Sequence, residues 1–155
     1  MNILCAIGQQ DAPEMLKRLQ EELGTQHNLY LLHVIDTGPR RELEAFMHRP
    51  GSRHPPPPEQ ARRIDAVEIT AGQAALDEAR MQAEQLGFNV QVDLQRGKPE
   101  QIIVQSARDR GCHLIVIWNS EGAQGRPLLG PESVGHTARF VLDHAPCDVL
   151  FLRGK

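Results

Sequence analysis

Glycines gather in one stretch of the sequence, between residues 119 and 135, where they could serve phosphate binding. Gly122, Gly125, Gly130 and Gly135 fall there, just before a segment with helical spacing. Only glycine lets backbone N–H groups approach and wrap a phosphate closely, and the N-terminus of a following helix adds a favourable dipole. The stretch predicts either a phosphate-binding loop or a surface loop that is rich in glycine and proline and binds no ligand.

Motifs for hydrolytic or transfer chemistry are missing from the sequence. It contains no G-x4-G-K-[S/T], H-E-x-x-H, G-x-S-x-G or C-x2-C string. His48 and His54 could capture a metal ion weakly, but we interpret them as residues of a solvated loop. His144 and Cys147 could meet across a turn, and we interpret them as structural. We therefore expect no catalytic residues and no metal site.

Composition places the chain among globular domains and argues against two classes of partner. Its 155 residues suffice for one domain with a full core, and 40% are hydrophobic and 24% charged. The net charge is −3, and one Trp and one Tyr are available for base stacking. We therefore expect no nucleic-acid partner. The apolar runs are too short to cross a bilayer, and residues 2–7 resemble a strand rather than a signal peptide.

The three cysteines indicate a reducing compartment. Cys5, Cys112 and Cys147 are odd in number and far apart in the sequence. Reduced structural thiols are the simplest interpretation, and the cytoplasm is the compartment that fits them best.

Strand-like and helix-like segments alternate along the chain, a pattern typical of a parallel sheet with helices on both faces. The polar alternation of residues 88–94 predicts an edge strand, and the continuously apolar residues 113–118 predict an inner one. Strands are expected at residues 2–7, 28–35, 88–94, 113–118 and 148–152.

Two helices have clear signals. The first is expected to begin at an N-cap, Asp11, with Glu14 completing a capping box, and to end at Gly24. A long helix is expected from about residue 59 to residue 86. Its expected apolar stripe consists of Ile64, Val67, Ala71, Ala74, Ala75 and Leu86.

From Asp36 to Pro58, between the second expected strand and the long helix, the regular pattern of strands and helices breaks down. Residues 55–58 are four consecutive prolines, which favour an extended stretch without backbone donors. We expect a flexible, Pro-rich insertion at about residues 37–58 within a single domain of residues 1–155. Such a stretch could also dock an unknown protein partner through polyproline recognition.

The last strand, Asp148 to Leu152, is apolar on both faces and would expose an adhesive edge in a monomer. We expect a homodimer in which this strand pairs with its copy, because two-fold dimers are the commonest oligomers. The alternative is that a helix of the same chain covers the strand.

Several segments, in order, resemble the universal stress protein family along nearly the whole chain. The resemblance is carried by residues 2–7 (NILCAI), 31–36 (LLHVID), 97–103 (GKPEQII), 114–117 (LIVI) and 144–150 (HAPCDVL). It implies a Rossmann-like α/β domain with a five-stranded parallel sheet in the order 3-2-1-4-5. It also implies dimers through the fifth strand and a role in the stress response, with one branch of the family binding ATP and another having lost nucleotide binding.

A phospho-receiver domain, the main rival fold, would need two acidic residues at the end of the first strand. Residues 6–10 read AIGQQ and contain none, so we reject that fold.

The resemblance places a ligand crevice between the first and fourth strands, where the strand order reverses. Gly122, Gly125 and Gly135 have the spacing of the G-x2-G-x9-G-[S/T] motif of the ATP-binding branch. In three places the chain departs from that pattern. Trp118 stands where the motif's first glycine normally lies, His136 replaces its Ser or Thr, and Gly8 replaces the family's acidic residue.

We therefore expect a universal-stress-type homodimeric regulatory or binding protein with an altered nucleotide crevice and no established catalysis. The alternative is an adenine-nucleotide binder that takes ATP with Mg²⁺ and hydrolyses it slowly. The expected crevice consists of Gly8, Gln9, Val34, Trp118, Asn119, Gly122, Gly125, Gly135 and His136.

Overall fold

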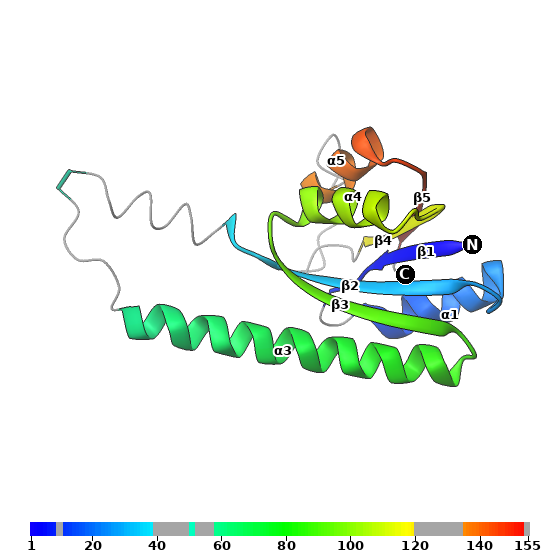
Figure 1. Cartoon of the computed structure of the whole chain (residues 1–155), viewed down its shortest axis with the longest axis horizontal. Coiled ribbons are helices and arrows are strands. Elements are labelled where there is room, and N and C mark those ends of the chain that lie inside the picture. Colours follow the sequence, from blue (N-terminus) through cyan, green and yellow to red (C-terminus); the bar gives the residue numbers. More distant parts are fainter. Residues whose placement is uncertain (9–10, 39–49, 52–57, 120–134, 154–155) are drawn as a thin grey trace.

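The computed structural model describes residues 1–8, 11–38, 50–51, 58–119 and 135–153. Five strands form one parallel sheet in the order β3-β2-β1-β4-β5 (Figure 1). This confirms the expected Rossmann-like α/β class, the edge position of the third strand and the inner position of the fourth. The strands are β1 (Asn2–Ala6), β2 (Asn28–Asp36), β3 (Asn89–Gly97), β4 (Leu114–Asn119) and β5 (Asp148–Arg153).

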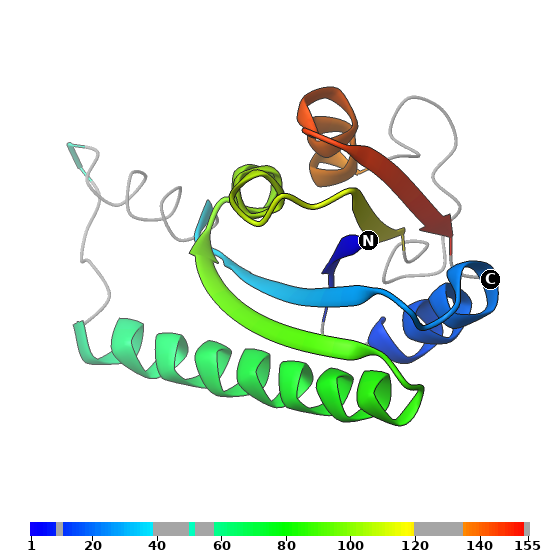
Figure 2. The same cartoon turned by 45° about the vertical axis from the view of Figure 1, so that its right-hand side comes forward.

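Helices cover both faces of the sheet. α1 (Ala12–Leu23) and α3 (Pro58–Gln85) lie on one face, and α4 (Pro99–Asp109) and α5 (His136–His144) lie on the other (Figures 1 and 2). The central strand β1 is buried from both sides, with Ile3 and Cys5 in the core beneath α1 and α3 and Leu4 in the core beneath α4 and α5. Parallel strands need this double cover because their two faces are both apolar.

The start of α1 differs from the prediction. Asp11 is at the N-cap position, and its carbonyl accepts the first helical hydrogen bond from the N–H of Met15 at 3.2 Å. Its side chain makes no capping hydrogen bond. The physical reason is its backbone conformation (φ −93°, ψ −14°), which is helical, whereas a capping side chain needs an extended N-cap. The predicted capping box with Glu14 is therefore wrong.

The apolar stripe predicted for the long helix is wrong for Ile64 and Val67, whereas Leu86, just after the helix, does pack against the core. The side chains that α3 buries are Leu76, Ala79 and Ala83, whereas Ile64 is 53% exposed and Val67 is 68% exposed. The reason lies in the placement of the helix, because its C-terminal half covers β2 and β3 while its N-terminal half extends past the sheet (Figure 1). α3 thus carries one apolar stripe that is buried and another that is exposed.

The predicted Pro-rich insertion falls largely on residues 39–49 and 52–57, outside the described residues. It stays a prediction, as does polyproline recognition there. Within the described ranges, no helix is both long and apolar enough to cross a membrane.

One close approach sets the distance between α3 and the sheet. His33 of β2 is buried, and its Nδ1 lies 2.9 Å from the carbonyl oxygen of Ile7, just after β1. Gly72 of α3 lies directly over this ring, where an added Cβ would be 2.9 Å from His33 Cδ2 and 3.0 Å from Leu94 Cδ1. A helix with any larger residue at this position could not pack as closely over β2 and β3.

We predict that Gly72→Ala lowers the free energy of unfolding by about 1–3 kcal/mol, because the added methyl group overpacks a side chain held by a hydrogen bond. In an unhindered helix the same change raises stability by about 0.5–1 kcal/mol. Urea denaturation measures the difference. Gln73→Ala, at the exposed neighbouring position, is the control and should change stability by less than about 0.5 kcal/mol. A stabilising Gly72→Ala would contradict the close approach.

Candidate functional site

A cavity of about 220 Å³ opens at the C-terminal ends of the strands, where the strand order reverses between β1 and β4. This is the place where open α/β sheets bind their ligands. The described wall is mostly apolar and comes from four strands and two helices. Its residues are Ala6, Ile7, Leu32, Val34, Pro99, Ile103, Ile117, Trp118, Gly135, Thr137, Ala138 and Phe151.

The strands bring these residues together through their register. Ala6 of β1 lies beside Leu32 of β2 on one side and beside Ile117 of β4 on the other. Ile117 in turn lies beside Phe151 of β5. Because side chains alternate between faces, these residues point toward the same layer of helices. The floor of the cavity is therefore built by residues far apart in the sequence.

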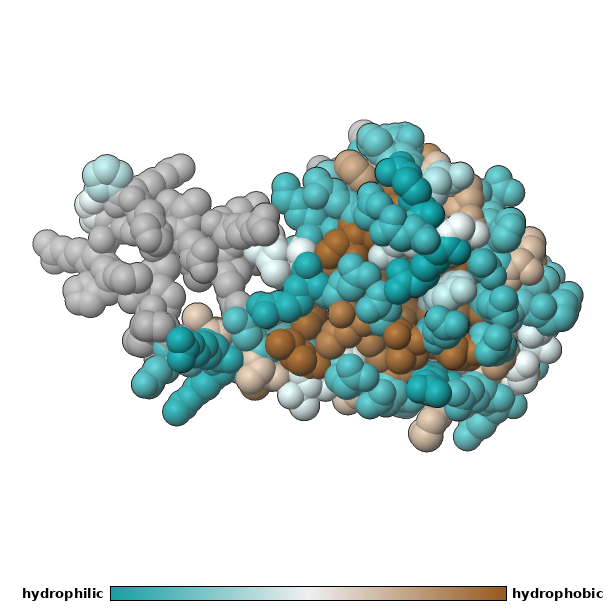
Figure 3. All heavy atoms as spheres, viewed as in Figure 1, coloured by the Kyte–Doolittle hydropathy of each residue, from teal (hydrophilic) through white to brown (hydrophobic). Residues whose placement is uncertain are grey.

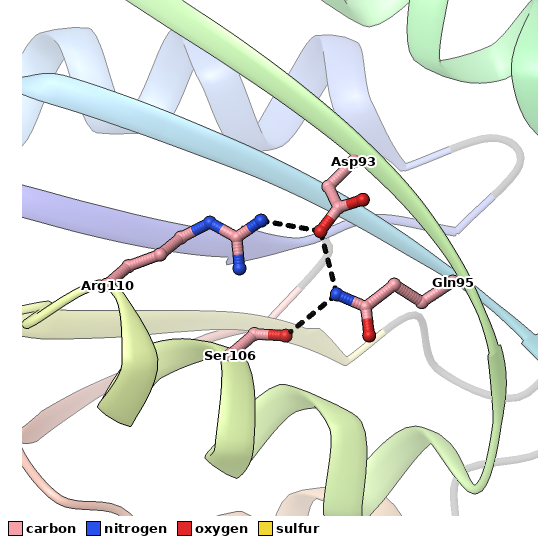
Figure 4. A network of polar contacts seen from close by, with 4 residues as sticks. All are labelled: Asp93, Gln95, Ser106 and Arg110. Carbon is pink, nitrogen blue, oxygen red and sulfur yellow. Dashed lines mark hydrogen bonds and ion pairs between the residues drawn. The ribbon is translucent and has the colours of Figure 1, made fainter.

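A polar network holds the helix that forms one wall (Figure 4). Arg110, at the end of α4, donates to Asp93 of β3 at 2.5 Å. Gln95 Nε2 donates both to Asp93 at 2.7 Å and to the hydroxyl of Ser106 at 3.1 Å. Ser106 is 3% exposed, and its contact with Gln95 is partly buried. The network fixes α4 against β3 and thereby positions the first turns of α4 beside the cavity.

A histidine and a carboxylate face each other beside the cavity. His136 Nε2, at the first residue of α5, lies 3.7 Å from Glu100 Oε1 in the first turn of α4. The Glu100 side chain is 15% exposed and that of His136 is 81% exposed. The two residues adjoin Pro99 and Gly135, which line the cavity. The pair is ionic only when His136 carries a proton.

Three of the predicted crevice residues, Val34, Trp118 and Gly135, line the cavity. His136 lies next to it, as just described. Gly8 follows Ile7, which is part of the wall, and Asn119 is the last residue of β4. Gln9, Gly122 and Gly125 lie outside the described residues, so the predicted glycine loop stays a prediction.

Sequence reasoning missed the contributions of α4 and β5. Pro99 and Ile103 come from α4, and Phe151 comes from β5. From the sequence, the stretch around Pro99 was used only as part of the family resemblance, and Phe151 only as part of a dimer edge. The signal that could have found them is topological, because a strand end and a helix start beside the switch point both face the crevice.

A carboxylate lies at the end of β1 although residue 8 is a glycine. A Cβ added at Gly8 would be 2.8 Å from Asp11 Oδ2, so the Asp11 side chain occupies the space that a side chain at residue 8 would need. Burial raises the pKa of the Asp11 carboxyl above its ordinary value. Asp11 was predicted only as a helix cap, and its placement here depends on the glycine three residues earlier.

The cysteines have the expected structural character. None is in a disulfide, and Cys5 and Cys112 are buried. Burial raises the pKa of all three thiols, which keeps them protonated and poorly reactive. His144 stacks on Phe140 with ring centroids 4.1 Å apart, and its Nδ1 lies 2.9 Å from the Phe140 carbonyl oxygen. These contacts agree with the structural interpretation of His144.

Solved structures of similar fold come from several kingdoms. A universal stress protein from Lactobacillus plantarum is 23% identical, covers 99% of this chain and 97% of its own, and has a TM-score of 0.65. An Arabidopsis thaliana family protein with AMP bound is 16% identical, with coverages of 100% and 92% and a TM-score of 0.65. An Archaeoglobus fulgidus protein in complex with dAMP is 18% identical, with coverages of 97% and 96% and a TM-score of 0.62.

The family model described as the universal stress protein family matches residues 1–153. No curated protein sequence is significantly similar to the chain.

We predict that Asp11→Asn raises the melting temperature at pH 7 by on the order of 1 °C, a small effect because the carboxyl keeps part of its contact with water. A raised folded-state pKa means that stability falls as pH rises from the ordinary Asp value of about 3.9 through the folded one. The difference should vanish near pH 3. Glu21→Gln, on the exposed side of α1, is the control. A lower melting temperature for Asp11→Asn at pH 7 would show that the ionised carboxylate supports the fold.

Proposed function

This chain belongs to the universal stress protein family, and from that premise we propose that it is a regulatory protein that binds an adenine nucleotide in the cavity between β1 and β4. The same proposal includes a cytoplasmic location, a role in the stress response and no established catalytic step. The observation that carries it is the cavity at the switch point of the sheet, with its largely apolar wall.

The size and chemistry of the cavity suit a purine base. Drug-sized ligands occupy pockets of about 300–1,000 Å³, so a cavity of about 220 Å³ fits a base better than a whole nucleotide. Trp118 and Val34 supply aromatic and aliphatic surface for the faces of the base, which favour stacking and apolar contact.

The sugar and phosphates would then extend toward the start of α5. There the helix N-terminus offers N–H groups and a favourable dipole, Thr137 offers a hydroxyl and His136 offers an imidazole. Asn119, Gln9, Gly122 and Gly125 complete the proposed site as predicted from the sequence. Structures of the same fold with AMP and with dAMP support adenine nucleotides as the ligand class.

Binding is better supported than hydrolysis. Among the described wall residues, Thr137 contributes the one side-chain hydroxyl, and the rest are apolar apart from the indole N–H of Trp118. The nearby Glu100 carboxylate would repel a polyphosphate unless His136 is protonated or a cation intervenes. The alternative, ATP with Mg²⁺ and slow hydrolysis, is tested by measuring release of inorganic phosphate from ATP under saturating conditions.

We predict that Gly135→Phe abolishes nucleotide binding while Gly135→Ala retains it. An added Cβ at Gly135 meets open space, so both variants should fold, but the phenyl group would fill the cavity mouth. Binding is measured as the rise in melting temperature with AMP, ATP and GTP, since a ligand at 100 times its Kd stabilises by about 2.7 kcal/mol. The expected result is an adenine-selective rise in the wild type and in Gly135→Ala only.

Two outcomes would count against this proposal. No rise in melting temperature at millimolar AMP or ATP would mean that the cavity does not bind adenine nucleotides. A rise of equal size in Gly135→Phe would place the nucleotide elsewhere on the protein.

We also propose a homodimer through β5, residues Asp148 to Leu152. β5 is an edge of the sheet, and Val149, Leu150 and Phe151 are each only partly buried. Pairing with the same strand of a second copy would satisfy the free backbone groups and cover these side chains.

We predict that Val149→Asp weakens this dimer, because it buries a charge in the contact. Sedimentation velocity should show a lower mass for Val149→Asp. Leu142→Asp is the matched control, because Leu142 is an exposed apolar residue on α5 rather than on the strand, and it should keep the wild-type mass. Equal masses for the wild type and Val149→Asp would argue against the contact.

A further inference from the structure

A largely buried carboxylate lies where the starts of two helices meet the cavity. Pro99 of α4 and Thr137 of α5 each line the cavity from the first turn of their helix. Glu100 and His136 are the residues next to them, and Glu100 Oε1 lies 3.7 Å from His136 Nε2. The carboxylate therefore lies between the two helix starts, in the part of the site toward which the sugar and phosphates of a nucleotide would extend.

The two helix starts favour a negative charge at this place. Neither N-cap residue, Lys98 of α4 or Gly135 of α5, makes a side-chain cap hydrogen bond. The N-terminal ends of helices carry unpaired N–H groups and a partial positive charge, which attract carboxylates and phosphates alike. The Glu100 carboxylate belongs to the first turn of α4 and faces the first residue of α5. The protein thus supplies an anion of its own where a ligand phosphate would be expected.

The charge of Glu100 is only weakly compensated. Among the residues that the structure describes, His136 is the one basic side chain in ion-pair contact with it, and their separation of 3.7 Å exceeds that of a hydrogen bond. The His136 side chain is 81% exposed, so water screens its effect. Hydrophilic residues cover much of the face shown in Figure 3, whereas the Glu100 side chain is only 15% exposed. Its charge therefore acts on a ligand in the cavity more strongly than a surface charge would.

The described wall of the cavity contains no cationic side chain that would offset this charge. Its residues are apolar apart from the hydroxyl of Thr137 and the indole N–H of Trp118. A phosphate monoester carries about 1.5 to 2 negative charges at pH 7, and each further phosphate adds more. Repulsion by a fixed carboxylate grows with the charge of the ligand. An adenine ligand with a long phosphate tail is therefore disfavoured more than one with a short tail or none.

We propose that Glu100 is a specificity-determining residue of this site. Its carboxylate takes the place of a ligand phosphate between the starts of α4 and α5, so the site prefers adenosine and its monophosphate to ATP. This inference rests on the proposed binding of an adenine nucleotide in the cavity and names the ligand class within it. A divalent cation bound to ATP offsets part of the phosphate charge, so the preference is largest when no such cation is present.

The test compares the loss of one negative charge at two positions of α4. Glu100→Gln removes the charge and keeps the shape of the side chain, whereas Asp109→Asn removes a charge from the exposed last residue of the same helix. Isothermal titration calorimetry with adenosine, AMP and ATP, without divalent cations, measures each Kd. The ratio of the ATP Kd to the adenosine Kd should fall on the order of tenfold in Glu100→Gln. It should fall less for AMP, and it should stay at the wild-type value in Asp109→Asn.

A change on the other helix tests the same electrostatic explanation. His136→Lys places a permanently charged ammonium group at the first residue of α5, in contact distance of the carboxylate. It should therefore also lower the ratio of the ATP Kd to the adenosine Kd. A higher ratio in His136→Lys than in the wild type would contradict selection by charge. Circular dichroism of each ligand-free variant checks that the fold is intact.

Three further results would overturn this inference, and they separate it from the function on which it rests. Equal ratios in the wild type, Glu100→Gln and Asp109→Asn, with all three ligands bound, would show that Glu100 does not select the ligand, while nucleotide binding stands. Weaker binding of ATP with Mg²⁺ by Glu100→Gln than by the wild type would show that the carboxylate instead holds a cation. Failure of the wild type to bind adenosine, AMP and ATP alike would overturn the selectivity together with the nucleotide site.

Discussion

The burial of β1 on both faces is the constraint on which the rest of the structure depends. A parallel strand at the centre of a sheet has two apolar faces, so helices must cover each of them. Ile3 and Leu4, neighbours in sequence, are each 1% exposed yet belong to cores on opposite sides of the sheet. The chain meets this requirement by crossing to β2 and β3 in one direction and to β4 and β5 in the other.

The candidate site is a consequence of that reversal. The connections leave β1 and β4 on opposite sides, and a cavity of about 220 Å³ lies at the ends of these strands. Its dimensions depend on polar contacts some distance away. Asp93, Gln95, Ser106 and Arg110 hold α4 on one side, and the buried His33 holds the end of β1 on the other. Loss of either support would move a wall of the cavity.

α3 shows why a pattern of apolar residues does not by itself identify the core. Its sequence has two sets of apolar residues, an exposed set that includes Ile64, Val67 and Met81 and a buried set of Leu76, Ala79 and Ala83. Periodicity by itself does not say which set faces the sheet, and the predicted stripe mixes the two: Ile64 and Val67 are exposed, whereas Leu86 packs against the core. The sheet covers only half of the helix, so the larger side chains of the N-terminal half remain exposed. Asp11 is a similar case, since its side chain turns to Gly8 rather than to the helix end.

The sequence by itself determined the fold class, the strand order that the family resemblance implied, and three of the cavity residues, Val34, Trp118 and Gly135. Those properties follow from local periodicity and from motifs, which are written in consecutive residues. Only the tertiary structure decided three other features: the cavity wall from Pro99, Ile103 and Phe151, the carboxylate beside Gly8, and the exposure of the apolar side chains Ile64 and Val67 on α3. Each of them depends on the distance between elements that are remote in the chain, and that distance is set by how the side chains between them pack.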